Sequence, residues 1–276
     1  MPFGVYVFRA VASLSLSCVV LLLAGSLRAE SSLTENLSSS LTEYNEGARF
    51  PLPALSEGQL RRLSSGKVVR IRDQISKDGG PQRITGLLVC DAQRDDLWVA
   101  FRDPHLTSLP ELTEVRISED GTWPTNWYQY FHMPGPFGDR HWVIAVDDNI
   151  ALAKQSDGRL WEHFWGLQPG GPELATQVVS TGEIPGVDSE MADKAIYPPV
   201  NEGAWLLVQL GQGRTLLGYT VRASIGGNIP DRMVASYSML TLARLLRRVE
   251  DRASVAADHY DAAHPRIRDG GGEALR

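Results

Sequence analysis

Short apolar runs, many alternating with polar residues, recur through the middle of this 276-residue chain and predict β-strands. Glycine- and aspartate-containing stretches such as 119–121 and 211–213 separate several of these runs, as expected for turns. Because most runs follow one another without an intervening helical pattern, the chain favours an antiparallel meander. The predicted strands cover residues 68–71, 84–90, 113–117, 127–133, 142–146, 160–165, 176–181, 205–210 and 216–223.

Two short segments show helical rather than alternating spacing. Ser56, with Leu60 and Leu63 after it, is typical of a short helix with a capping residue. Residues 91–102 carry an amphipathic pattern that Asp103 and Pro104 end, which predicts a second short helix.

A longer helix follows the last predicted strand and closes the fold. Its apolar opening begins at residues 229–230, where a proline is tolerated in the first turn. Met233, Tyr237 and Leu240 repeat at helical spacing, so we expect these three side chains to face the sheet.

The order of these elements predicts an α+β architecture. Residues 147–149 are expected to form a hairpin turn and residues 183–200 an irregular loop. What remains is a curved antiparallel β-sheet wrapped around one long C-terminal helix, which is the helix-grip fold. A curved sheet and a single helix leave space between them, so this fold favours a ligand cavity.

The two ends of the chain differ from the folded middle. Residues 1–29 have the pattern of a secretory signal peptide: Arg9, then an apolar run of about 14 residues, then small residues. Because about 20 residues are needed to span a bilayer, we expect cleavage; retention as an anchor is the alternative. Residues 30–54 are expected to be a flexible segment, residues 55–255 the folded domain and residues 256–276 a disordered tail.

Composition narrows the class of protein. The net charge of −6 gives no indication of nucleic-acid binding. Beyond the leader, Cys90 is the single cysteine, so no internal disulfide can form, and its apolar surroundings predict a buried thiol. Arginine far outnumbers lysine, which is typical of a GC-rich bacterial genome and places the exported protein in the periplasm or outside the cell.

Three stretches resemble a known family. Residues 133–142 have its proline-rich approach to an Asp-Arg turn and an aromatic-led strand, and residues 226–230 have the glycine pair and Ile-Pro that open its closing helix. Residues 92–103 match its short helix after the second strand. Together they resemble START-like lipid-binding domains of the Bet v 1-like (SRPBCC) superfamily. His141 departs from the family pattern, in which an acid usually stands after the arginine.

The resemblance implies that a lipid or another hydrophobic small molecule is bound inside the fold, with transient membrane contact as a further expectation. Alternation places Trp127 with Phe131, and Trp142 with Ile144, on shared strand faces that serve as core or as cavity wall. The expected ligand-binding residues are Trp127, Phe131, Arg140, Trp142, Ile144, Leu217, Tyr219, Met233, Tyr237 and Leu240.

Two assignments stay open in the sequence. Arg140 either holds a polar head group or fixes the turn with Asp139, and the turn is the favoured interpretation. On the predicted strand 160–165, a stripe led by Trp161 competes with one led by Leu160 for the inward face.

No motif for chemistry stands out. The histidines lack the spacing of a metal site, and no phosphate loop or nucleophile elbow is present, so neither catalytic residues nor cofactors are assigned. The alternative to a binding module is a cyclase or hydrolase type of enzyme on an apolar substrate, with Arg140, His141 and His163 as candidates. A third hypothesis is an interaction module that uses the Gly/Pro-rich stretch 167–200.

Overall fold

The computed structural model describes residues 32–73, 80–102, 111–119, 123–256, 267–273 and 275. The signal peptide predicted over residues 1–29 lies outside these ranges and stays a prediction.

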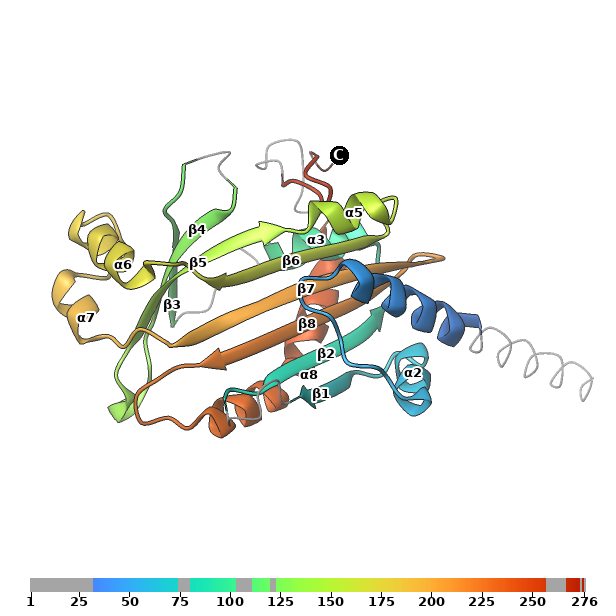
Figure 1. Cartoon of the computed structure of the whole chain (residues 1–276), viewed down its shortest axis with the longest axis horizontal. Coiled ribbons are helices and arrows are strands. Elements are labelled where there is room, and N and C mark those ends of the chain that lie inside the picture. Colours follow the sequence, from blue (N-terminus) through green and yellow to red (C-terminus); the bar gives the residue numbers. More distant parts are fainter. Residues whose placement is uncertain are drawn as a thin grey trace, which may run out of the picture.

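One antiparallel sheet organises the described chain, in the spatial order β1-β2-β8-β7-β6-β5-β4-β3 (Figure 1). A long helix, α8 (Asp231–Ala253), lies against one side of the sheet, as the helix-grip prediction requires. The strands are β1 (Val69–Asp73), β2 (Arg83–Cys90), β3 (Leu112–Arg116), β4 (Thr125–Phe131), β5 (Arg140–Asp148), β6 (Leu160–Leu167), β7 (Val200–Gly211) and β8 (Arg214–Ser224). The shorter helices are α2 (Glu57–Ser64), α3 (Arg94–Arg102), the 3-10 turn η1 (Gly135–Phe137), α5 (Ile150–Gln155), α6 (Gly171–Ser180) and α7 (Ser189–Lys194).

Three local predictions are wrong. Residues 176–180 belong to α6 and Thr181 caps it, where a strand was expected over 176–181. Ala175 and Val179 lie one helical turn apart and are buried against the sheet. The expected loop 183–200 contains α7. The expected turn 147–149 instead ends β5, and the Asn149 side chain caps α5 by accepting from Leu152 N.

The strand register separates an inner face, toward α3 and α8, from an outer face. Paired residues across neighbouring strands share a face, and one such row runs through Gly86, Tyr219, Trp205, His163 and Asp148. Asp148 bonds to Arg102 of α3, which identifies this row as inner. Alternate residues of each strand therefore point outward.

The outer face carries a helix that the sequence analysis missed. Residues 32–47 are helical, with Leu37 and Tyr44 fully buried against the outer face. The prediction of flexibility over residues 30–54 is wrong for residues 32–54, because an apolar stripe at helical spacing is embedded among polar residues. The boundary between the N-terminal segment and the folded domain at residue 55 stays a prediction.

A buried carboxylate fastens this N-terminal helix to the sheet. Glu162 of β6 is fully buried, and its oxygens accept from Tyr44 Oη at 2.8 Å, Arg49 N at 2.8 Å and Phe50 N at 2.9 Å. Asn149 Nδ2 donates to the same carboxylate at 2.7 Å. Four donors satisfy the buried acid, so residues 49–50, which follow the helix, are held in place against the sheet.

Close approach sets the position of α8. Leu242 lies directly over Gly86 of β2, where a Cβ would be 2.5 Å from Leu242 Cγ. The helix packs mainly on β1, β2, β8 and α3, and Leu246 and Val249 are buried in the same interface. The glycine thus selects which stripe of α8 faces the sheet.

Candidate functional site

The inner face of β4 and β5 carries four of the predicted ligand residues. Trp127 pairs with Ile144, and Phe131 and Trp142 lie on the same face by register. Ile144 is buried, whereas the three aromatic side chains are only half-buried. We call these four residues the β4–β5 inner surface. The main strand contacts of α8 lie on β1, β2 and β8, so the helix leaves this surface largely uncovered.

Beside this surface, the inner face continues into an aromatic cluster around α3. Trp98 is fully buried and meets Trp161 edge-on, with ring centroids 5.0 Å apart. Phe101 stacks on Trp205 at 4.8 Å, and Trp205 meets Tyr219 at 4.5 Å. Burial raises the pKa of Tyr219 to about 12, so its hydroxyl stays neutral.

The aromatic cluster shows which side chains of β6 face inward, a question that the sequence left open between the Trp161 and the Leu160 stripes. Trp161 and Trp165 face inward with His163, while Leu160 packs with the N-terminal helix outside and Phe164 lies beneath Arg49.

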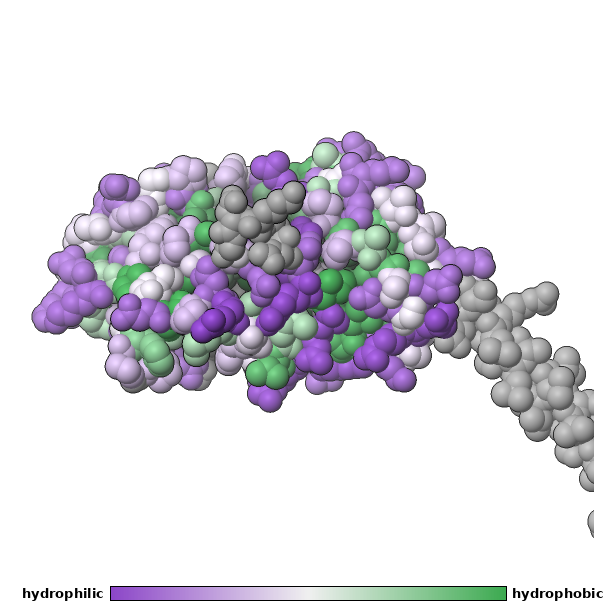
Figure 2. Space-filling view, turned by 60° about the horizontal axis from the view of Figure 1, so that its bottom comes forward, coloured by the Kyte–Doolittle hydropathy of each residue, from purple (hydrophilic) through white to green (hydrophobic). Residues whose placement is uncertain are grey.

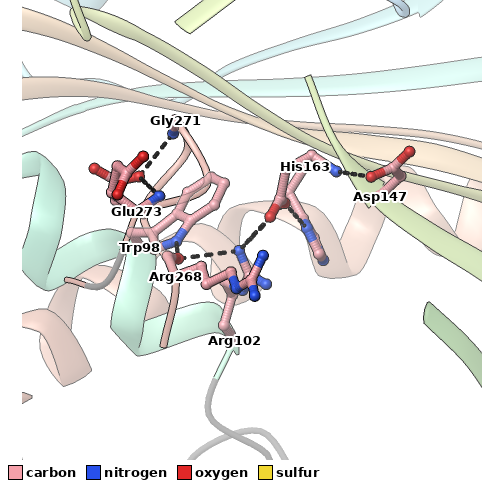
Figure 3. A network of polar contacts seen from close by, with 9 residues as sticks. Trp98, Arg102, Asp147, His163, Arg268, Gly271 and Glu273 are labelled. Atoms are coloured by element: carbon pink, nitrogen blue, oxygen red, sulfur yellow. Dashed lines mark hydrogen bonds and ion pairs between the residues drawn. The ribbon is translucent and has the colours of Figure 1, made fainter. Parts of the chain in front are cut away.

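A charged triad lies where this cluster meets the end of β5. Arg102 Nη1 is 2.9 Å from Asp148 Oδ2, and His163 Nδ1 is 2.6 Å from Asp148 Oδ1 (Figure 3). The three side chains are 12%, 3% and 14% exposed, so this is a largely buried group of one cation, one acid and one imidazole.

Protonation in the triad follows from its surroundings. Burial and the nearby Arg102 charge hold the pKa of His163 below its ordinary value, against the opposing pull of Asp148. Burial alone would raise the pKa of Asp148, but the His163 hydrogen bond and the Arg102 charge bring it below its ordinary value. At neutral pH a neutral His163 therefore donates its Nδ1–H to an ionised Asp148, which also accepts from Arg102.

A second polar chain crosses the β4–β5 inner surface. Trp142 Nε1 donates to Gln129 Oε1 at 2.5 Å, and Gln129 Nε2 donates to Glu114 of β3. Glu114 remains accessible to solvent, yet burial among its neighbours raises the pKa of its carboxyl.

His163 was a candidate from sequence, but its partners Arg102 and Asp148 were missed, and so was Glu114. Arg102 and Asp148 are 46 residues apart, and Asp148 and His163 are 15 apart, so no linear motif joins them. Only the predicted strand order could have brought β5 and β6 together.

Arg140 serves the turn rather than an open pocket. Its guanidinium donates to Ile225 O at 2.9 Å and Gly226 O at 3.0 Å, and also to the carbonyls of Phe137 and Gly138. These bonds tie the β4–β5 connection to the entry of α8. Backbone carbonyls hold the guanidinium, as the favoured interpretation expects, while Asp139 accepts from Tyr130 Oη and Met133 N.

The three predicted residues on α8 are misplaced. Met233, Tyr237 and Leu240 are 55%, 69% and 76% exposed and lie opposite the sheet-facing stripe. The helix has two apolar stripes at helical spacing, and Leu242 over Gly86 selects the other one. Of the remaining candidates, Leu217 and Tyr219 face inward but lie in the aromatic cluster on β8.

The three candidate catalytic groups do not converge. His141 is buried on the outer face, with its Nδ1 3.4 Å from Tyr128 Oη, and burial lowers its pKa. His163 faces inward, and Arg140, which shares the inner face by register, is bound at the β4–β5 connection instead. Among the described residues, no three of the side chains His, Cys, Asp and Glu could together hold a metal ion, and no helix could cross a membrane.

One open hollow of about 570 Å³ lies between residues 47–49, the end of β5 and the start of α5, and Asp148 of the triad is part of its lining. Its lining includes Arg49 and Phe164 and none of the predicted ligand residues.

No protein-family model matches the chain, and no curated protein matches it. Solved structures do. Human STARD10 superposes with a TM-score of 0.50 at 12% identity, covering 70% of this chain and 71% of that one. A STAR-related lipid transfer protein from Xanthomonas axonopodis gives 0.49 at 17% identity, covering 68% and 93%. Human StAR-related lipid transfer protein 5 gives 0.45 at 12% identity, covering 83% and 99%. The STARD10 match and the observed topology establish a START-like helix-grip fold.

Proposed function

We propose that this protein is a START-like binding module that carries a lipid or a similar hydrophobic molecule on the β4–β5 inner surface, beside α8. The observation that carries the proposal is that Trp127, Phe131 and Trp142 stay half-buried on the inward face. Covering such rings returns about 25 cal/mol for each Å² of apolar area removed from water, before ordering costs. A hydrophobic ligand supplies that cover.

The polar groups around this surface favour an amphipathic ligand. The donors of Trp98 and Arg102 lie near one end, where the Arg268 carbonyl accepts from them in this structure, and Glu114 presents an acceptor at the β3 side. A molecule with an apolar body and one polar end matches this arrangement.

Native mass spectrometry tests the proposal. The protein expressed without residues 1–29 would be incubated with a panel of fatty acids, phospholipids and sterols, and with dansyl-undecanoate as a fluorescent probe. We expect a one-to-one complex with at least one of them. Absence of any complex would contradict the proposal, and recovery of a ligand with altered mass would favour the enzymatic alternative.

Two variants locate the binding. Phe131→Asp places a charge on the β4–β5 inner surface and is expected to abolish the complex. Leu240→Ser removes an equally hydrophobic but outward-facing side chain and is expected to leave the complex unchanged. Equal loss in both would indicate adsorption to the exterior instead.

We also propose that the exposed stripe of α8 contacts membranes during ligand exchange. Met233, Tyr237 and Leu240 form an apolar line along the helix, and Arg244 and Arg248 continue it with exposed positive charge. Apolar residues bordered by arginines favour the surface of an anionic bilayer. Figure 2, which brings forward the lower side of Figure 1, shows hydrophobic patches bordered by hydrophilic residues.

Vesicle co-sedimentation checks this contact. The protein is expected to sediment with phosphatidylglycerol vesicles more than with phosphatidylcholine vesicles, and Leu240→Ser should reduce the bound fraction. Val255→Ser changes another exposed apolar residue just past the far end of α8 and is the matched control. Sedimentation that ignores lipid charge and Leu240 would contradict the proposal.

Export to the periplasm or the exterior is the proposed setting, and it rests on the pattern of residues 1–29. N-terminal sequencing of the protein recovered from a bacterial periplasmic extract, with a leaderless chain as control, distinguishes cleavage from retention.

A further inference from the structure

A short segment after α8 folds back onto the polar end of the site. Residues 267–273, here called the strap, form a compact loop around the Asp269 carboxylate, which accepts from Gly271 N and Glu273 N at 2.9 Å each. Asp269 N donates to Glu273 O at 2.7 Å, and Gly272 N donates to Asp269 O at 3.0 Å. The prediction of a disordered tail over residues 256–276 is therefore wrong for the strap.

The strap lies on α3 and β6. Its Arg268 carbonyl accepts from the Trp98 indole Nε1 at 2.8 Å and lies 3.5 Å from Arg102 Nη1 (Figure 3). Gly270 lies so close to Trp161 that a Cβ there would be 2.2 Å from Trp161 Cγ. One backbone carbonyl thus occupies two donors at the polar end of the site.

We propose that the strap is an internal competitor, which closes the polar end of the site and is displaced by the acceptor group of a ligand. This rests on the proposed function. Trp98 is fully buried, and a buried indole N–H without an acceptor is costly. Either the Arg268 carbonyl or an oxygen of the ligand accepts the hydrogen bond from the Trp98 indole. The indole N–H therefore has an acceptor both when the strap is docked and when a ligand has displaced it.

The composition and contacts of the strap favour its detachment from the domain. Three of its seven residues are the glycines at 270–272, which bury no side chain, and its hydrogen bonds are mostly internal to the loop. Its contacts with the domain are made by the Arg268 carbonyl, the close packing of Gly270, and Ile267 and nearby Leu275 beside the aromatic cluster. The Arg268 guanidinium also lies 5.7 Å from the centre of the Trp123 ring, and Gly272 lies beside Ile150. Few contacts of this kind give a segment a low local stability.

Competition has a measurable consequence. When only a fraction of molecules has an open site, the apparent dissociation constant rises by the inverse of that fraction. If the strap is docked about nine-tenths of the time, its removal tightens binding about tenfold.

Gly270→Val and Gly271→Ala form a matched pair for the test. The first places side-chain atoms inside Trp161, whereas a Cβ at Gly271 meets only the Asp269 side chain, at 3.3 Å. A chain ending at residue 266 removes the strap without a new clash. Each would be made in the otherwise full chain without residues 1–29, and titrated with dansyl-undecanoate, an apolar chain with one carboxylate.

Two readouts separate the hypotheses. Hydrogen exchange of the Trp98 indole, followed by NMR, reports strap release without any ligand, and probe fluorescence reports binding. We expect Gly270→Val and the shortened chain to speed exchange and bind about tenfold more tightly, with Gly271→Ala unchanged. Faster exchange with unchanged or weaker binding would overturn the competitor role. Absence of probe and lipid binding in every variant would instead overturn the proposed function.

Discussion

The two faces of β4 and β5 are formed by the same two strands, but they differ in how far their side chains are buried. On the outer face, Tyr128 and Val143 are fully buried beneath α6 and α7. On the inner face, their sequence neighbours Trp127 and Trp142 remain half-buried. The outer residues stabilise the fold, whereas the inner ones keep apolar surface that a ligand can cover. Alternation identifies the two faces, but only the covering elements decide which one is free to bind.

Tyr128→Ala should give the largest effect, because it removes a fully buried ring from the outer face. We expect the free energy of unfolding to fall by about 3–5 kcal/mol, measured by urea denaturation. The folded fraction should bind dansyl-undecanoate as the parent does. Lost affinity with unchanged stability would reverse the assignment of the two faces.

Phe131→Ala is the inner-face counterpart. Because its ring is only half-buried, we expect less than about 1.5 kcal/mol of destabilisation but about a tenfold weaker complex with the same probe. Fluorescence titration beside urea denaturation measures both quantities. A loss of stability equal to that of Tyr128→Ala would show that Phe131 belongs to the closed core.

Acid should act on both faces. His141 outside and His163 inside have pKa values held below 6.5, mainly by burial, so below pH 6.5 the unfolded chain binds protons that the native state does not. Stability should therefore fall as pH drops from 6.5 toward the native pKa values, and Asp148 should add a further loss below its ordinary pKa near 4.

Replacing either histidine by Asn should reduce that slope by up to about 1.4 kcal/mol per pH unit. Urea denaturation between pH 5 and 7 measures the slope, and only His163→Asn should also change probe binding. An unchanged slope in both variants would show that neither imidazole is held neutral.

Leu240→Ser should have the smallest effect. Its side chain lies on the solvent side of α8, so we expect the free energy of unfolding to change by no more than about 0.5 kcal/mol. Leu246→Ala on the buried stripe of the same helix is the control, with an expected loss of about 2–5 kcal/mol. Similar losses in both would contradict the placement of α8.

The architecture was predictable because strand alternation and turn residues are local signals. Eight predicted strands and the closing helix are present, and the helix-grip order is confirmed. The strand predicted over residues 176–181 is absent because Val178 and Val179 favour strands locally, while tertiary packing of Ala175 and Val179 holds a helix. Propensity is a weak guide when a β-branched residue is buried by helical spacing.

The site was predictable only in part. The inner surface of β4–β5 follows from alternation, and its four members were all identified. The stripe of α8 was chosen wrongly, because the decisive contact of Leu242 with Gly86 joins residues far apart in sequence. The Arg102–Asp148 pair has the same origin, since tertiary proximity rather than spacing creates it.

The Glu162 anchor has a mechanical meaning. Tension applied to the chain ahead of residue 32 would pass along the N-terminal helix and reach the sheet through the hydrogen bonds of Tyr44, Arg49 and Phe50. Those bonds converge on β6, an interior strand held on both sides by β5 and β7. A force from that end would be resisted by the hydrogen bonds of β6 to both β5 and β7, and it would not separate an edge strand from the sheet. It would also act on the face opposite the β4–β5 inner surface.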